Sequence, residues 1–198
     1  MEKQKKILII ASIILVLLMG IFVLVKLLPE KDNNSNKSSN SQENNAVVEP
    51  LVGKSKEEIS SVAIKNSLGE FTATRSGEGE NVSYSISGLN DGENVEQLSI
   101  EELINNISNI KSLKIVADNL ENAAIYGLEN PTAQITVDCL DGSKIILKKG
   151  TNAPLSQGAY AMVDGKNKVY LISLSDLELF ESSRAVYIQD KDTNSLEE

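Results

Sequence analysis

Residues 134–149 read QITVDCLDGSKIILKK, and this stretch decides the fold. Its first half alternates apolar and polar side chains, and its second half continues the alternation after Asp141-Gly142, a pair typical of tight turns. We therefore predict a β-hairpin with strands at 134–140 and 143–149. Five side chains are expected to face the core: Ile135, Val137, Cys139, Ile145 and Leu147.

Further strands are expected on both sides of this hairpin. A second hairpin is predicted downstream at 159–163 and 168–172, turning at Asp164-Gly165. Upstream, short alternating segments predict strands at 62–64, 71–73, 82–86 and 113–117.

Three segments carry helical signals. Apolar residues recur at helical spacing over 99–111, where Ser99 and Glu102 fit a capping box. A short helix is predicted at 120–126, ended by Gly127 in a positive-φ conformation. Ser175 with Glu178 predicts the start of a last short helix.

The fold class that follows is α+β, with a predominantly antiparallel sheet and short helices on one of its faces. The predicted domain covers residues 55–190, and Val186, Tyr187 and Ile188 are expected to add an edge strand near its end. Residues 191–198 form an acidic tail.

The N-terminal region predicts one transmembrane helix. Residues 7–25 contain no charged side chain, and at ~1.5 Å per residue they match the ~30 Å hydrocarbon thickness of a bilayer. The alternative is a cleaved signal peptide, but the apolar run is longer than the ~7–15 residues usual there. We predict an anchor at 7–28 and, from the lysines before it, a cytoplasmic tail at 1–6 and an extracytoplasmic domain.

Residues 33–45 are almost entirely polar, and they indicate a flexible Asn/Ser-rich linker that we place at 29–54. The chain carries a formal net charge of −9, which disfavours nucleic acid as a partner because phosphate backbones repel an acidic surface. Cys139 is the single cysteine, so no disulfide can form within the chain.

The sequence contains few of the residue combinations that are typical of catalytic sites. The chain contains no histidine, which removes histidine-based triads and the usual catalytic zinc sites, and we predict neither a cofactor nor a metal. Asp138 and Asp141 form a weak candidate pair of carboxylates or calcium ligands, although Asp141-Gly142 and Asp164-Gly165 are explained as turns. Cys139 is expected to be a core residue, and the run Lys148-Lys149-Gly150 a solvated strand end that could meet an anion.

A family resemblance adds to this reading. The run IYGLENPTA at 125–133, followed by the hairpin, Tyr160 and VYLI at 169–172, resembles the bacterial family "domain of unknown function 4340", as does IKSLKIV at 110–116. The resemblance covers roughly residues 55–190 and implies a membrane-tethered envelope domain, with some relatives linked to ABC-type export or gliding motility. It implies no catalytic residues. The chain departs from the pattern by having Tyr84 where relatives often have tryptophan and by carrying a single unit.

Three functions are open at this point. The first is a non-enzymatic interaction module that contacts a protein partner in the envelope, such as an ABC transporter component. The second is a domain that binds an envelope polymer or small ligand between sheet and helix. The third, which we favour least, is an enzyme using carboxylates such as Glu101 or Asp138.

Overall fold

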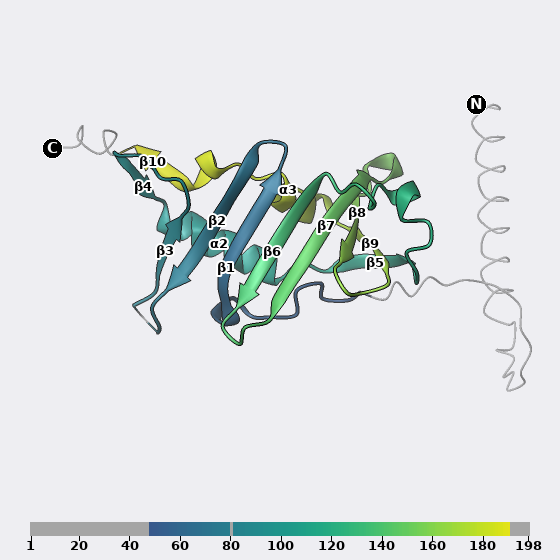
Figure 1. The fold of residues 1–198 in the computed structure, drawn as a ribbon, viewed down its shortest axis with the longest axis horizontal. Helices are drawn as coiled ribbons and strands as arrows, with labels where there is room; N and C mark the ends of the chain where they lie inside the picture. Colours follow the sequence, from purple (N-terminus) through teal and green to yellow (C-terminus); the bar gives the residue numbers. More distant parts are fainter. Residues whose placement is uncertain (1–47, 80, 191–198) are drawn as a thin grey trace, which may run out of the picture. The chain divides into compact units, whose positions relative to one another are not determined.

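The computed structural model describes residues 48–79 and 81–190, and an eight-stranded sheet dominates this region (Figure 1). Every neighbouring pair of strands is antiparallel, in the order β3-β2-β1-β6-β7-β8-β9-β5. The strands of this sheet are β1 (Ile59–Asn66), β2 (Gly69–Ser76), β3 (Ser83–Ile86), β5 (Ser112–Ala117), β6 (Ala133–Cys139), β7 (Lys144–Asn152), β8 (Ala159–Val163) and β9 (Val169–Ile172).

The predicted central hairpin is confirmed as β6 and β7. Val137 pairs with Ile145 and Ile135 with Leu147, so the apolar side chains share one face. The turn falls at Asp141-Gly142, and Gly142 has a φ of 81°, a conformation that glycine adopts without steric cost. The second hairpin, β8 and β9, is confirmed as well.

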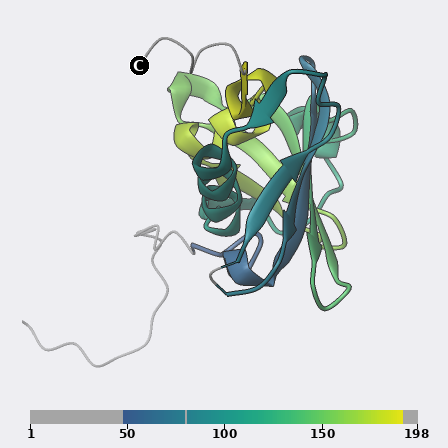
Figure 2. The ribbon, with the colours of Figure 1, turned by 90° about the vertical axis from the view of Figure 1, so that its left-hand side faces the viewer.

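Two α-helices cover the apolar face of the sheet, as Figure 2 shows. They are α2 (Gln97–Ser108) and α3 (Leu174–Phe180). The predicted apolar stripe of the longer helix is buried against the strands, with Ile100 and Ile107 fully inaccessible to solvent. The α+β architecture, with helices on one face of an antiparallel sheet, is therefore confirmed.

The N-caps predicted for both helices are wrong, by three residues for α2 and by two residues for α3. Helix α2 begins at Gln97, so Ser99 lies inside its first turn rather than capping it. Helix α3 begins after Ser173, whose hydroxyl accepts a hydrogen bond from the backbone N–H of Asp176. Ser175 therefore lies within the helix, although its spacing to Glu178 matches a capping box.

The C-terminal segment forms a separate two-stranded sheet. β10 (Ile188–Asp190) pairs with β4 (Glu93–Val95), a strand that the sequence analysis did not predict. Val186 and Tyr187 belong to a 3-10 turn, η4 (Arg184–Tyr187). The predicted edge strand is thus confirmed only for Ile188, and it joins the small sheet instead of the large one.

The folded region begins before Ser55, earlier than predicted. Leu51 and Val52 are buried core residues, and Pro50 forms a β-bridge with Lys111. The carboxylate of Glu49 accepts hydrogen bonds from Lys168 (2.7 Å) and the Tyr170 hydroxyl (3.2 Å). Residues 48–54 of the predicted linker are therefore part of the domain.

The predicted anchor at 7–28, most of the linker and the tail at 191–198 lie outside the described residues. Within residues 48–79 and 81–190, no helix combines the length and the hydrophobicity that a membrane crossing requires.

The connection from β5 to β6 contains a single 3-10 turn, η2 (Ala123–Tyr126), where the sequence predicts a short helix over 120–126. Gly127 ends it with a φ of 69°, as predicted. A methyl group at Gly150 on β7 would collide with the carbonyl oxygen of Tyr126, so the two backbones approach too closely for any side chain there. The glycine of the Lys148-Lys149-Gly150 run is therefore explained by packing.

Candidate functional site

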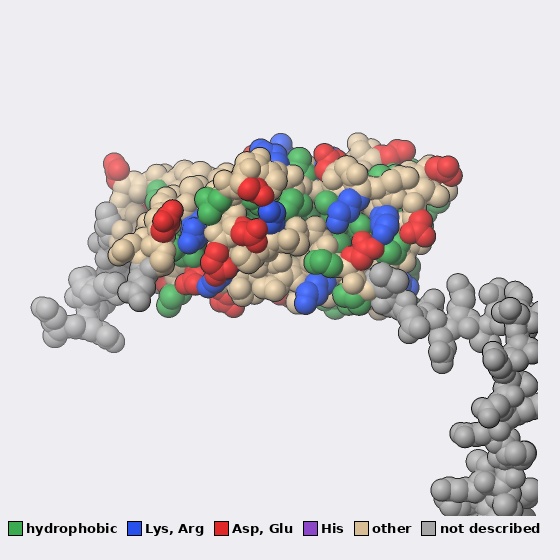
Figure 3. Space-filling model, turned by 90° about the horizontal axis from the view of Figure 1, so that it is seen from below, with side chains coloured by type: hydrophobic (Ala, Val, Ile, Leu, Met, Phe, Trp, Pro, Cys, Tyr) green, Lys and Arg blue, Asp and Glu red, His purple; other side chains and the backbone are tan. Residues whose placement is uncertain are grey.

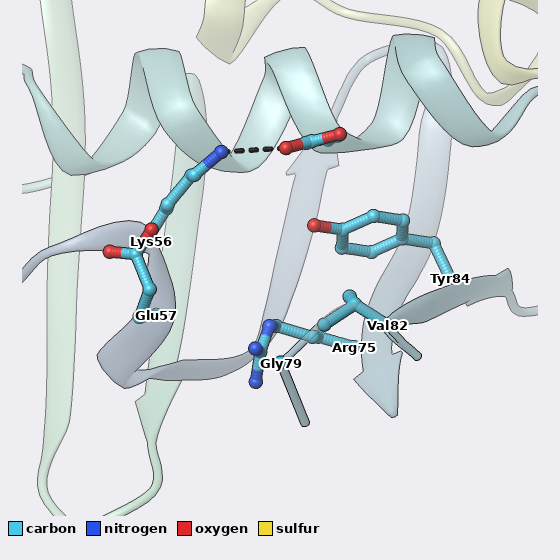
Figure 4. Close-up of a pocket in the computed structure, with 7 residues that line it drawn as sticks. Lys56, Glu57, Arg75, Gly79, Val82 and Tyr84 are labelled. Atoms are coloured by element: carbon cyan, nitrogen blue, oxygen red, sulfur yellow. Dashed lines mark hydrogen bonds and ion pairs between the residues drawn. The ribbon is translucent and has the colours of Figure 1, made fainter. Parts of the chain in front are cut away.

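The candidate site is a pocket of about 280 Å³ between helix α2, the 3-10 turn η1 (Lys56–Glu58) and the ends of β2 and β3 (Figure 4). We call it the α2–β3 pocket. Seven residues line it: Lys56, Glu57, Arg75, Gly79, Val82, Tyr84 and Glu101. A larger hollow of about 390 Å³ lies near the β1–β2 turn, but Lys65 is the one ionisable side chain among its described lining residues.

Alternation along β2 and β3 brings Arg75 and Tyr84 to this pocket. Arg75 lies two and four residues beyond the core residues Ala73 and Phe71, so it shares their face of the sheet. Tyr84 lies directly opposite Arg75 on the neighbouring strand. Arg75 and Tyr84 therefore lie on the same face of the sheet as the core residues, just beyond the last buried apolar side chains.

Gln97, the first residue of α2, fixes the position of Tyr84. Its carboxamide accepts a hydrogen bond from the backbone N–H of Tyr84 and donates one to the backbone carbonyl of Tyr84, both at 2.8 Å. This pairing reproduces the two bonds that a neighbouring strand would supply, and β3 is the edge strand of the sheet. The helix and the edge strand are thereby held together beside the pocket.

An ion pair forms the wall of the pocket on the helix side. The Lys56 amine donates to the Glu101 carboxylate at 2.6 Å, the dashed contact in Figure 4. This hydrogen bond, followed by the charge of Glu101, raises the pKa of Lys56. Backbone and Ser55 hydrogen bonds hold the pKa of Glu57 below its usual value, and Lys56 and Arg75 contribute through their charges.

Arg75 and Tyr84 have unused hydrogen-bonding capacity. Among the described residues, neither the Arg75 guanidinium nor the Tyr84 hydroxyl makes a side-chain hydrogen bond or ion pair. In Figure 4 these two side chains border the pocket from the strands, whereas Lys56 and Glu57 border it from η1. On the strand side, the pocket therefore presents two donor groups that no described residue occupies, Arg75 and Tyr84. On the other side it presents the carboxylates of Glu57 and Glu101.

The weak carboxylate candidates do not form a site together. Asp138 lies on the sheet face opposite the helices and pairs with Lys144 at 3.0 Å. Asp141 lies in the hairpin turn, where Lys54 donates to it at 2.6 Å and lowers its pKa strongly. In the part of the chain that the structure describes, no group of three or more cysteine, aspartate or glutamate residues is arranged to hold a metal ion.

The remaining candidates, Cys139, Lys148 and Lys149, are buried in the core or held in ion pairs. Cys139 is buried on the core face of β6, as predicted. Lys148 pairs with Asp164 at 2.8 Å. Lys149 is buried, contrary to the expectation of a solvated lysine, and lies 3.3 Å from Glu181 at the end of α3.

Sequence reasoning named Glu101 but missed the other charged residues of the pocket. One signal was available: Arg75 continues the inward-facing positions of β2, where an arginine is unusual. The pairing of β2 with β3 then places it beside Tyr84, which lies in the segment 82–86 that the alternation predicts as a strand.

Comparison with known families identifies the chain. A profile of the family described as "Domain of unknown function (DUF4340)" matches residues 89–193, more than half of the chain. The chain belongs to this family. No curated protein and no solved structure matches it.

The DUF4340 match is shorter than the resemblance predicted from the sequence. It begins at Leu89 and so leaves out β1, β2 and β3. The α2–β3 pocket therefore combines Glu101 from the matched segment with Arg75 and Tyr84 from strands outside it. The family assignment confirms the resemblance and assigns no role to these residues.

Proposed function

We propose that this DUF4340 chain is a membrane-anchored, extracytoplasmic interaction module that binds a protein partner in the cell envelope and catalyses no reaction. The apolar run at 7–25 supports the anchor predicted at 7–28, and the lysines before it support the orientation. The partner we propose is a component of an ABC-type export system, the association that the family resemblance implies.

The observation that carries the proposal is the α2–β3 pocket. Its free donors, Arg75 and Tyr84, lie beside the Lys56–Glu101 ion pair on a rigid frame of helix and strand. Arginine and tyrosine are enriched at the centres of protein interfaces because both combine a large contact area with directional hydrogen bonds. A partner group inserted here would complete hydrogen bonds that the described residues leave open.

One face of the domain carries charges of both signs. In Figure 3, basic and acidic side chains are interspersed over the face that is seen from below, with apolar groups between them. On this face no sign of charge dominates, so the choice of partner depends on particular groups such as Arg75 and Tyr84.

Affinity capture from crosslinked membranes tests the proposal. The tagged full chain is compared with a variant lacking residues 48–190, with R75Q and with K65Q, which removes a lysine on β1 that is 70% exposed and paired with Glu70. We expect one set of envelope proteins to be enriched by the wild type and K65Q and lost with the deletion and R75Q. Equal enrichment by the deletion variant would refute the interaction module.

A second candidate function is binding of an envelope polymer or small ligand. The volume of the pocket, about 280 Å³, is at the lower end of ligand clefts and suits a small group better than a polymer segment. Retention of the full chain on purified wall material, lost in R75Q, would favour this function over a protein partner.

A further inference from the structure

We infer that the α2–β3 pocket binds a carboxylate, in the form of the C-terminal residue of a peptide chain. This inference rests on the proposed function and names the chemical group that the pocket recognises. It follows from the donors, the acceptors, the charge and the size of the pocket.

The donor side matches a carboxylate. The planar guanidinium of Arg75 can give two parallel N–H bonds to the two oxygens of one carboxylate, a geometry that lysine cannot reproduce. Tyr84, directly opposite on β3, adds a hydroxyl donor on the same face of the sheet. Gln97 holds the backbone of Tyr84 through two hydrogen bonds, and so fixes the part of β3 that carries this hydroxyl.

The acceptor side matches a nearby N–H group. Lys56 occupies one oxygen of the Glu101 carboxylate, Oε1, at 2.6 Å. The second oxygen, Oε2, takes part in no hydrogen bond among the described residues and can accept one from a ligand. A carboxylate and an N–H joined to the same α-carbon are the two backbone polar groups of a C-terminal peptide residue.

The charge of the pocket favours a monoanion. Lys56 and Glu101 neutralise each other, and Glu57 places a further negative charge near Arg75. The four charged lining residues carry no net charge together, so the pocket has no excess positive charge that would favour a doubly charged phosphate over a carboxylate. The volume of about 280 Å³ leaves room for one or two residues of a peptide.

An NMR titration tests this inference, because the chain contains only two arginines. Arg184 donates to the carbonyl oxygen of Gly88 and lies 3.3 Å from Glu93, so its side-chain Nε–H signal is an internal reference. The ¹⁵N-labelled full chain in detergent is titrated with acetyl-Ala-Ala bearing a free carboxylate. We expect the Nε–H signal of Arg75 to shift and saturate while the signal of Arg184 stays in place.

Two further probes separate the sources of a carboxylate. Acetyl-Ala-Ala-amide lacks the terminal charge, and acetyl-Asp-Ala-amide carries its carboxylate on a side chain. We expect no saturable shift with the amide and binding at least ten-fold weaker with the aspartyl peptide. Equal binding of the amide would overturn the inference, and stronger binding of the aspartyl peptide would overturn the assignment to a chain end.

Variants of the pocket provide the second readout. R75Q should lose binding of acetyl-Ala-Ala by about ten-fold or more, since hydrogen bonds to charged groups are the strong ones. Y84F should lose it a few-fold, and K65Q should bind as the wild type does. Unchanged affinity in R75Q, with the other amide signals of the protein in their native positions, would contradict the inference.

The two proposals fail in distinguishable ways. If R75Q abolishes capture of envelope proteins but no peptide carboxylate shifts Arg75, the interaction module stands and the chain-end ligand is wrong. If peptides bind as described but no envelope protein is captured, the ligand stands and the protein-partner function is wrong.

Discussion

Single residues show where the backbone of this domain is closely packed. Gly158, just before β8, has a φ of 128°, and a methyl group there would collide with the carbonyl oxygen of Ile172. Gly165, in the β8–β9 turn, also has a positive φ of 78° but opens onto free space. The two glycines thus share an unfavourable conformation for other residues and differ in steric contact.

Replacing each glycine with alanine separates the two effects. We expect G158A to lower the free energy of unfolding by about 1–3 kcal/mol more than G165A, the usual cost of forcing extra volume into a packed site. Urea denaturation of the full chain gives the comparison. Equal losses in the two variants would mean that the close approach of β8 and the end of β9 is absent.

Glu49 predicts a pH dependence of stability. The hydrogen bond from Lys168 is the main cause that lowers its pKa below the ordinary 4.5, against the opposing effect of burial. A carboxyl whose pKa is lowered by folding stabilises the protein above its unfolded pKa, and this contribution disappears as the pH falls through the folded value. The stabilisation should therefore be complete at neutral pH and lost below about pH 4.

The variant E49Q measures this contribution. At pH 7 it should unfold at lower urea concentration than the wild type, because the Glu49 side chain loses the charge that strengthens its hydrogen bonds from Lys168 and Tyr170. The difference between the two proteins should shrink as the pH is lowered from 5 to 3. If the difference in stability between E49Q and the wild type stayed constant over this pH range, the charge of Glu49 would not contribute to stability.

Secondary structure elements were predictable wherever their signal was local. The alternation in 134–149 and the Asp-Gly turns identified the β6–β7 and β8–β9 hairpins, and the apolar stripe identified α2. Pairings between distant segments left no such signal, among them β1 with β6 and β4 with β10. The α2–β3 pocket escaped prediction for the same reason, because η1, two strands and a helix meet there only in the folded chain.

The start of α3 provides a test of capping at the element scale. Ser173 accepts the bond from the backbone N–H of Asp176 at 3.1 Å, whereas the one hydrogen bond of the Ser175 hydroxyl within residues 48–79 and 81–190 is to the Ser173 hydroxyl. We expect S173A to cost about 1 kcal/mol of unfolding free energy and S175A less than about 0.5 kcal/mol. Thermal or urea unfolding measures both losses. A larger loss of unfolding free energy in S175A than in S173A would show that Ser175 caps the helix, as the sequence predicts.

At the scale of the whole molecule, the proposed placement of the domain outside the membrane can be tested with its single cysteine. Cys139 is only 5% exposed, so the native chain gives little background labelling, whereas the neighbouring Leu140 is 64% exposed. A membrane-impermeant maleimide should label L140C in intact cells and leave the wild type unlabelled until it is denatured. Labelling of L140C only after the cells are permeabilised would place the domain in the cytoplasm.

The measurement that tests the central claim most directly is photo-crosslinking from the α2–β3 pocket in living cells. A photoreactive residue replaces Val82, which lines the pocket, and as a control it replaces Leu155, which is 89% exposed on the β7–β8 connection. We predict that position 82 crosslinks to one envelope protein, that R75Q abolishes this crosslink, and that position 155 does not form it. The same crosslink from both positions, or a crosslink from position 82 that persists in R75Q, would contradict the binding function of the pocket.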